Sequence, residues 1–180
     1  MGAAWMVRNH EGVVVCHSRK AFAEIKTKDE AKLQSILRAS ESMTSLRLNR
    51  IITAGEFEEF FGAVMRPFAL PSFLFQRDEI CMSMKEIGDW QVLVVKKEAN
   101  RGASFIADSV NKRGLVQSYV ARGHPTWLSD LFLYEMEAYL ASLTPTLVPG
   151  SGSSFSSTSS ASVAFGYEGV WWFVALRESC

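Results

Sequence analysis

The stretch Thr27–Met43, TKDEAKLQSILRASESM, has the apolar spacing of an amphipathic helix. Thr27 is followed three residues later by Glu30, the capping-box pattern that marks a helix start. At about 100° per residue, Lys32 shares a face with Ile36, whereas Glu30 lies about 200° away from Lys32. We therefore predict that this helix packs against a core and that Glu30 points to solvent.

The length and composition of the chain fit one soluble globular domain. It has 180 residues, of which 48% are hydrophobic and 21% charged, and its formal net charge is zero. Residues 1–132 hold 18 Lys and Arg against 15 Asp and Glu, an excess too small to identify a partner. The three cysteines lack metal-type spacing, and no secretory signal or membrane-length apolar run is visible. These features predict an intracellular protein of the nucleus or cytoplasm that does not span a membrane.

Strand and helix patterns alternate through the first two thirds of the chain. A polar turn at residues 9–12 separates two β-rich runs and predicts an antiparallel hairpin of Ala4–Val7 and Val13–His17. After the opening helix, the patterns predict further elements in the order strand, helix, helix, strand, helix, at Asn49–Ala54, Glu58–Val64, Ser72–Glu86, Trp90–Lys97 and Arg101–Val110. This order indicates an α/β layered domain.

The composition changes after about residue 132. Leu133–Leu143 has a helical pattern, and eight of the thirteen residues in Gly150–Ser162 are serine, which is typical of a flexible linker. Phe165–Leu176 is an aromatic run that stands isolated behind this linker. We predict a domain at residues 1–132 and a disordered C-terminal extension at residues 133–180.

Three segments of residues 1–132, taken together, resemble the ribonuclease H-like domain of plant retroelement reverse transcriptases. Gly2–Gly12 resembles the family's second strand and its turn, and the opening helix followed by Ile51–Glu56 resembles its first helix and next strand. Lys97–Ala103, KEANRGA, is similar to the family's Arg-x-x-Asn-x-x-Ala stretch. The resemblance implies a mixed sheet flanked by helices, with the family's first strand missing from this chain, so that the domain is truncated and degenerate.

The resemblance also implies a chemistry, the Mg²⁺-dependent hydrolysis of the RNA strand of an RNA–DNA hybrid. The family uses two metal ions held by four acids, which come from the first strand, the first helix, the end of the next strand and the last helix. Lys32 stands at the position of the helix acid and Ser104 at that of the fourth. Glu56 matches the third, which makes it the one catalytic and metal-binding candidate. Its other interpretation is an ordinary acid at a helix N-terminus, and Asp108, one turn beyond Ser104, is interpreted as a surface residue.

With one acid of four, we expect hydrolase activity to be lost and nucleic-acid binding to remain. Lys32, Lys97, Asn100 and Arg101 are the candidate contacts, because basic side chains flanking the cleft could hold a phosphate backbone. The same charges could instead be solvated ends of helices and strands. The alternative function is accordingly a non-catalytic interaction or remnant protein with no nucleic-acid role. We expect surface positions for His10, His17 and His124, and the sequence does not specify the oligomeric state.

A missing central strand has a structural consequence. Ala4–Val7 and Asn49–Ala54 would each present an unpaired edge in the middle of the sheet, and such edges favour aggregation. The only spare β-prone segment is Gly169–Leu176. Two outcomes are open, a gapped and weakly stable sheet or a sheet completed by this segment. We expect the gapped sheet.

Overall fold

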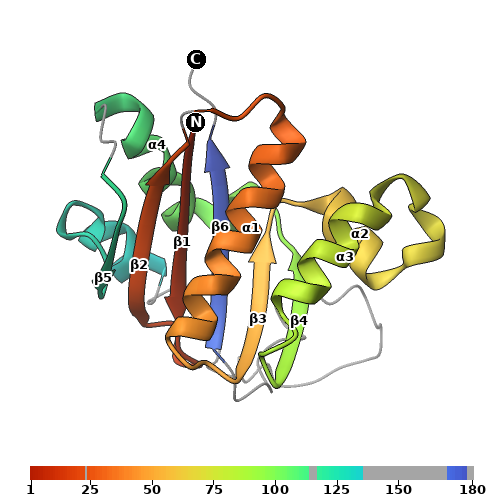
Figure 1. The fold of residues 1–180 in the computed structure, drawn as a ribbon. Helices are drawn as coiled ribbons and strands as arrows, with labels where there is room; N and C mark the ends of the chain where they lie inside the picture. Colours follow the sequence, from red (N-terminus) through yellow and green to blue (C-terminus); the bar gives the residue numbers. More distant parts are fainter. Residues whose placement is uncertain (23, 114–116, 136–169, 178–180) are drawn as a thin grey trace, which may run out of the picture.

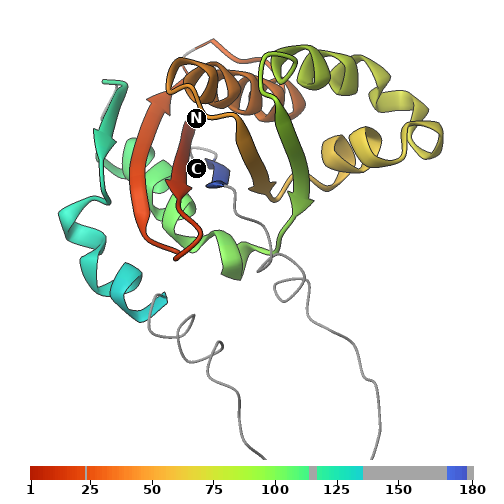
Figure 2. The ribbon, with the colours of Figure 1, turned by 90° about the horizontal axis from the view of Figure 1, so that it is seen from below.

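A computed structural model describes residues 1–22, 24–113, 117–135 and 170–177 of the chain. These residues form one six-stranded mixed sheet, in the order β4-β3-β6-β1-β2-β5, with helices on both faces (Figure 1). Seen along the sheet in Figure 2, α1, α2 and α3 lie on one side and α4 on the other. The prediction of a layered α/β architecture is confirmed.

The N-terminal hairpin is formed by β1 (Gly2–Arg8) and β2 (Val14–Ala21), which pair antiparallel. Its turn is held by the Asn9 side chain, whose oxygen accepts hydrogen bonds from the backbone N–H groups of Glu11 and Val13. Gly12 closes the turn with φ +81°, a left-handed conformation that glycine adopts without a steric penalty. The predicted hairpin is therefore confirmed.

The opening helix is α1 (Lys28–Ser45), and its start matches the capping pattern in the sequence. The Thr27 hydroxyl accepts a hydrogen bond from the Glu30 N–H at 3.1 Å, and the Glu30 carboxylate accepts one from the Lys26 N–H at 3.2 Å. Ile36 and Met43 are fully buried, whereas Glu30 is exposed. The helix packs through one face, as predicted.

Parallel strands and helices follow α1 in the predicted order. They are β3 (Arg50–Gly55), α2 (Glu58–Met65), α3 (Leu74–Ser83), β4 (Asp89–Val94) and α4 (Arg101–Arg113). Short 3₁₀ turns connect them or precede a helix, at Pro67–Ala69 (η1), Pro71–Phe73 (η2), Lys97–Asn100 (η3) and Thr126–Leu128 (η4). One strand was not predicted, the four-residue edge strand β5 (Tyr119–Arg122), which pairs antiparallel with β2.

The sheet has no central gap, because β6 (Val170–Arg177) lies between β1 and β3. It runs antiparallel to β1, from Gly2↔Arg177 to Arg8↔Trp171, and parallel to β3 over Ile51–Gly55. The expectations of a gapped sheet and of an isolated aromatic run were therefore wrong. The physical reason is that two adjacent open edges with buried faces provide pairing partners on both sides of one β-prone segment.

Part of the extension predicted at 133–180 belongs to the sheet, because β6 is one of its strands. Residues 129–135 are helical, which agrees with the start of the predicted Leu133–Leu143 helix. The remainder of that helix and the serine-rich segment Gly150–Ser162 lie outside the described residues. Residues 170–177 share one sheet with the segment that was expected to form the domain alone.

Two apolar cores lie on opposite faces of the sheet. The larger core joins the buried side chains of β1, β3 and β6 to α1, α2 and α3, and includes Trp5, Ile36, Phe60, Phe61 and Ile80. The smaller core joins β1 and β2 to α4 and to the region of residues 128–132, through Met6, Ile106 and Phe132 among others. Val174 of β6 belongs to the larger core. The last strand is consequently part of the buried interior.

His17 ties the edge strand β5 to the sheet. Its side chain is only 3% exposed, and its two ring nitrogens lie 2.7 Å from the Gly123 carbonyl oxygen and 3.0 Å from the Tyr119 hydroxyl. The expectation of a surface role for His17 was wrong, because pairing of β2 with β5 covers it. Burial lowers the pKa of His17 below its ordinary value of 6.5, the Gly123 hydrogen bond opposes this, and the charges of His124 and Arg19 add to it.

This burial predicts a pH dependence of stability. Because the pKa of His17 is lower in the folded than in the unfolded chain, the unfolded chain binds more protons as the pH falls below 6.5. We expect the free energy of unfolding to decrease over that range and to be fully retained above it. Denaturant unfolding between pH 7.5 and 5 measures this change. The slope should flatten in His17→Gln but not in His10→Gln, and equal slopes in the two variants would contradict the assignment.

Candidate nucleic-acid interface

The candidate site lies at the carboxyl end of the parallel strands β3, β4 and β6. In open α/β sheets, ligands commonly bind outside this end of the strands. Glu56 follows β3 directly, the turn η3 and the start of α4 follow β4, and α1 begins at the same end of the sheet (Figure 1). The start of α1, the end of β3 and the Lys97–Ala103 segment, which carry two of the three motif resemblances, therefore meet at one end of the molecule.

The Glu56 carboxylate lies within hydrogen-bond distance of two side chains, one from α4 and one from the turn before it. Its Oε1 accepts hydrogen bonds from Asn100 Nδ2 at 3.2 Å and from Ser104 Oγ at 3.4 Å. The single hydroxyl hydrogen of Ser104 is shared with the Asn100 carbonyl oxygen, which lies closer at 2.7 Å and gives the ordinary back-bond of a helical serine. The structure thus brings together the two candidate residues Glu56 and Asn100, and adds Ser104 from the position of the fourth family acid.

The last strand contributes a backbone group to this cluster. Asn100 is completely buried, and its Nδ2 donates a second hydrogen bond to the Val174 carbonyl oxygen at 2.8 Å. No Asp or Glu occurs between Val170 and Arg177. The central strand therefore supplies a carbonyl to the site and no carboxylate. This contact was not predicted from the sequence, although the β-prone run Val170–Leu176 indicated that a strand could form there.

Lys32 is held by acidic neighbours. Its ammonium lies 3.3 Å from the Asp29 carboxylate and 3.4 Å from that of Glu59, and it sits 5.6 Å from the centre of the Phe60 ring. The side chain is 15% exposed. Because two carboxylates already compensate its charge, Lys32 is a poorer phosphate contact than the sequence predicted.

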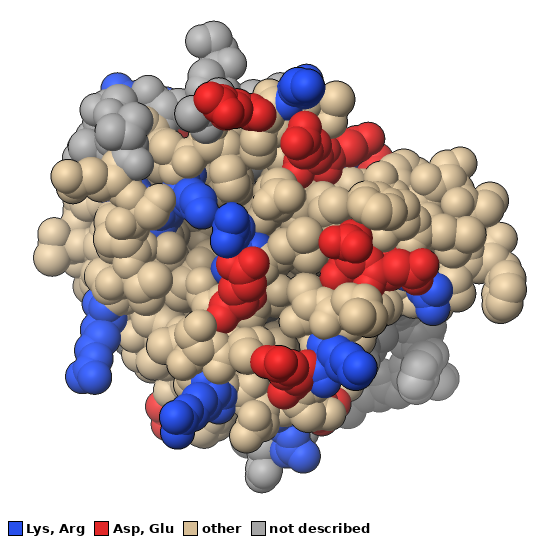
Figure 3. Space-filling model, viewed as in Figure 1, with Lys and Arg blue, Asp and Glu red and all other residues tan. Residues whose placement is uncertain are grey.

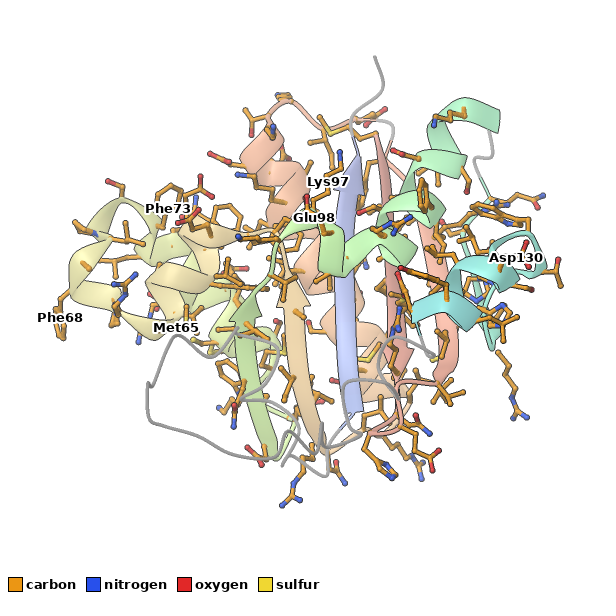
Figure 4. The ribbon with its side chains drawn as sticks, turned by 180° about the vertical axis from the view of Figure 1, so that it is seen from behind. Met65, Phe68, Phe73, Lys97, Glu98 and Asp130 are labelled. Atoms are coloured by element: carbon orange, nitrogen blue, oxygen red, sulfur yellow. The ribbon has the colours of Figure 1, made fainter. Side chains whose placement is uncertain are left out.

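Lys97 and Arg101 are differently placed. Both are exposed, and neither forms an ion pair within the described part of the chain. They flank Asn100 in sequence, in the turn η3 and at the first position of α4. Figure 4 shows Lys97 and Glu98 in this turn, near the carboxyl end of β6, which η3 contacts. The structure therefore leaves two uncompensated cations beside the Glu56 cluster.

The side chains around Glu56 do not fit a magnesium ion. Mg²⁺ prefers several oxygen ligands, with one or two carboxylates among them. One oxygen of Glu56 already accepts a hydrogen bond from an Asn100 N–H and lies 3.4 Å from the Ser104 hydroxyl, so that hydrogen-bond donors rather than further oxygen ligands face it. Among the described residues, no three His, Cys, Asp or Glu side chains are grouped as a metal site would require. Asp108 lies one turn beyond Ser104 and is partly buried.

The surface on the α1 side carries charges of both signs. Figure 3 shows Lys and Arg side chains interspersed with Asp and Glu, without an extended area of one sign. A continuous basic groove, which would favour strong binding to a phosphate backbone, is not visible on this face.

Within the described ranges, no helix has both the length and the apolar character needed to cross a bilayer.

Comparison with known proteins adds no further assignment. No family model matches the sequence, and no curated protein matches it. Any function is therefore inferred from the residues around Glu56 and from the resemblance of the motifs.

Proposed function

We propose that this chain is a ribonuclease H-like nucleic-acid-binding domain that has lost hydrolase activity. The observation that carries the proposal is the cluster of Glu56, Asn100 and Ser104. These residues stand at three motif positions that are 44 and 4 residues apart in sequence, and their side chains are hydrogen-bonded. A chance resemblance of weak motifs gives no reason for those positions to meet.

The arrangement of the sheet supports the same fold. In the ribonuclease H-like fold, the first strand is central in the sheet, and its loss was expected to leave open edges on the second strand and on the strand after the first helix. Here β6 occupies the place between the two corresponding strands, β1 and β3. We infer that the C-terminal strand takes the structural role of the family's first strand, so that the order of elements along the chain is changed while the layout of the sheet is kept.

The loss of hydrolysis follows from the residues that stand at the four positions where the family has metal-binding acids. Two-metal hydrolysis requires carboxylates that hold both ions near the attacking water and the leaving oxygen. In this chain the central strand has no acid, the helix position is Lys32, and the fourth position is Ser104. A single carboxylate, Glu56, cannot bind two divalent ions. Activity is therefore expected to be absent rather than reduced.

Binding without cleavage is the function that the remaining charges support. Lys97 and Arg101 are exposed, and phosphate contacts from such side chains give sequence-independent affinity. Two contacts predict weak binding of an RNA–DNA hybrid that falls about tenfold between 50 and 200 mM salt. Because Lys32 is already paired with two carboxylates, it should contribute little to this affinity.

The proposal predicts no cleavage of a labelled RNA–DNA hybrid in Mg²⁺, together with weak, salt-sensitive binding of the same hybrid. Reversing both free charges, Lys97→Glu with Arg101→Glu, should weaken binding at least about tenfold. A control with the same change in net charge, Lys85→Glu with Lys112→Glu, should retain most of the affinity, as should Lys32→Gln. Metal-dependent cleavage that disappears in Glu56→Gln would overturn the loss of activity. Equal effects of the two double variants would overturn the proposed interface.

A second candidate function, a protein interaction module, is favoured by exposed apolar side chains around α2 and α3. Phe68 is fully exposed, and Phe75 and Met82 are each 66% exposed. Figure 4 shows Phe68 at the tip of this region, directed away from the sheet. Large exposed apolar side chains are common at protein interaction sites. Absence of hybrid binding even at 50 mM salt would favour this candidate over nucleic-acid binding.

A further inference from the structure

A polar groove lies on the α1 side of the sheet, over β1, β2 and β5. It has a volume of about 400 Å³, within the usual range of small-molecule sites. Its walls are the side of α1 and the edge of the sheet near β5. Figure 3 shows Lys and Arg side chains close together on this face, with an acidic side chain beside them. The groove is separate from the Glu56 cluster, whose residues do not line it.

The register of the strands fixes which side chains face the groove. Trp5 pairs with Ser18, and Ser18 pairs with Val120, so these three side chains form a row across β1, β2 and β5. Trp5 packs in the same core as Ile36 of α1, which places the row on the α1 side. Lys20, two residues beyond Ser18, points to the same side. The floor of the groove is thus partly apolar, with one hydroxyl and one ammonium group.

Two cations from different elements line the groove. Lys20 comes from β2, and its ammonium lies 6.0 Å from the Phe22 ring without an ion pair among the described residues. Arg38 comes from α1, and its guanidinium bonds the Glu41 carboxylate at 2.9 Å. Both partners of that pair are more than half exposed, so the pair is weak and Arg38 can exchange Glu41 for another anion. Arg19 also lines the groove, but its side chain alternates to the other face of β2, where its guanidinium lies 4.7 Å from the centre of the Tyr119 ring. Without Arg19, the groove carries one more positive than negative side chain.

Ser18 is the second sign of a ligand. It is only 8% exposed and lines the groove, and its hydroxyl group forms no side-chain hydrogen bond within the described ranges. Ser35 and Ser42, which also line the groove, bond backbone carbonyls of α1 instead. The Ser18 hydroxyl, on the α1 side of β2 and at the wall of the groove, is therefore available to a ligand.

We propose that this groove binds a nucleotide through its phosphate. Arg38 and Lys20 neutralise the phosphate, Ser18 donates a hydrogen bond to it, and the apolar floor of Trp5 and Val120, with the Phe22 ring, receives the base. The volume matches a nucleoside monophosphate, and such a unit is presented either by a free nucleotide or by a single-stranded nucleic acid. This inference does not rest on the proposed function, because it uses other residues on another part of the sheet.

The test is a calorimetric or NMR titration of the full chain with adenosine monophosphate, adenosine and inorganic phosphate. The monophosphate is expected to bind more tightly than either fragment. Arg38→Gln and Lys20→Gln should each weaken it about tenfold and Ser18→Ala about fivefold, whereas the exposed control Lys85→Gln should leave it unchanged. Glu41→Gln should tighten binding, because it removes the competing carboxylate and leaves the core intact.

A short single-stranded oligonucleotide then separates the two sources of the ligand. If it binds more tightly than the monophosphate and responds to the same variants, the groove takes nucleotides of a strand; if it binds no better, the ligand is a free nucleotide. Lack of binding of every probe at millimolar concentration would overturn the proposal. It would also be overturned if Glu41→Gln weakened binding or if Lys85→Gln weakened it as much as Arg38→Gln. None of these results bears on hybrid binding at Lys97 and Arg101.

Discussion

Deleting residues 170–180 is expected to abolish the cooperative unfolding transition of this protein. Without β6, the edges of β1 and β3 lose their backbone partners along Gly2–Arg8 and Ile51–Gly55. Each unpaired buried backbone group costs about 1–3 kcal/mol. The larger core also loses Val174, and Asn100 loses its carbonyl acceptor. The sum exceeds the roughly 5–15 kcal/mol that stabilises a typical domain, so the shortened chain should unfold or aggregate.

A matched deletion isolates the strand from the rest of the C-terminal region. Removing residues 150–162, the serine-rich segment that the sequence predicts to be a linker, leaves the residues of β6 in place. Because the entropy of loop closure varies slowly with length, this deletion should change the free energy of unfolding by less than about 1 kcal/mol. Both variants are measured by thermal and denaturant unfolding with circular dichroism. An unchanged midpoint after deletion of residues 170–180 would show that the sheet does not depend on β6.

The second large effect is expected from Asn100→Asp. The amide of Asn100 donates to both Glu56 and the Val174 carbonyl, and it is completely buried. An ionised carboxylate in its place has no hydrogen to donate and faces the negative charge of Glu56. Burying an unpaired charge beside a like charge should destabilise the fold by about 3 kcal/mol or more at pH 7.

Two further variants separate the charge from the loss of the amide. Asn100→Ala removes the donor without adding a charge and should cost about 1–3 kcal/mol, less than Asn100→Asp. Asn49→Asp makes the same chemical change at an exposed position and should have little effect. Denaturant unfolding gives all three values. An Asn100→Asp chain that is as stable as the Asn100→Ala chain would contradict the close contact with Glu56.

Those elements that are specified by local signals were predictable from the sequence. The N-cap at Thr27 and the glycine at the end of the hairpin turn act within a few residues, and both elements formed where expected. The position of β6 was not predictable in this way. Its β-prone composition was visible, but its place depends on two edges more than a hundred residues away in sequence. The edge strand β5 has only four residues, too few for a pattern to stand out.

The candidate site was predictable to the extent that it depends on motif order. Glu56 and Asn100 were named from the sequence, and their side chains are in contact. The ion pairing of Lys32 was not predictable, because one of its two carboxylate partners, Glu59, is 27 residues away on α2. The burial of His17 was missed for a related reason, since it depends on the unpredicted strand β5. Errors in the site therefore follow errors in long-range pairing.

The most direct test of the central claim, that β6 completes the sheet between β1 and β3, is a set of backbone NOEs in the isotope-labelled full chain. We expect NOEs between Trp5 and Val174 and between Thr53 and Trp172, the paired positions on the two sides of β6. Backbone NOEs directly between β1 and β3, with none to residues 170–177, would contradict the account.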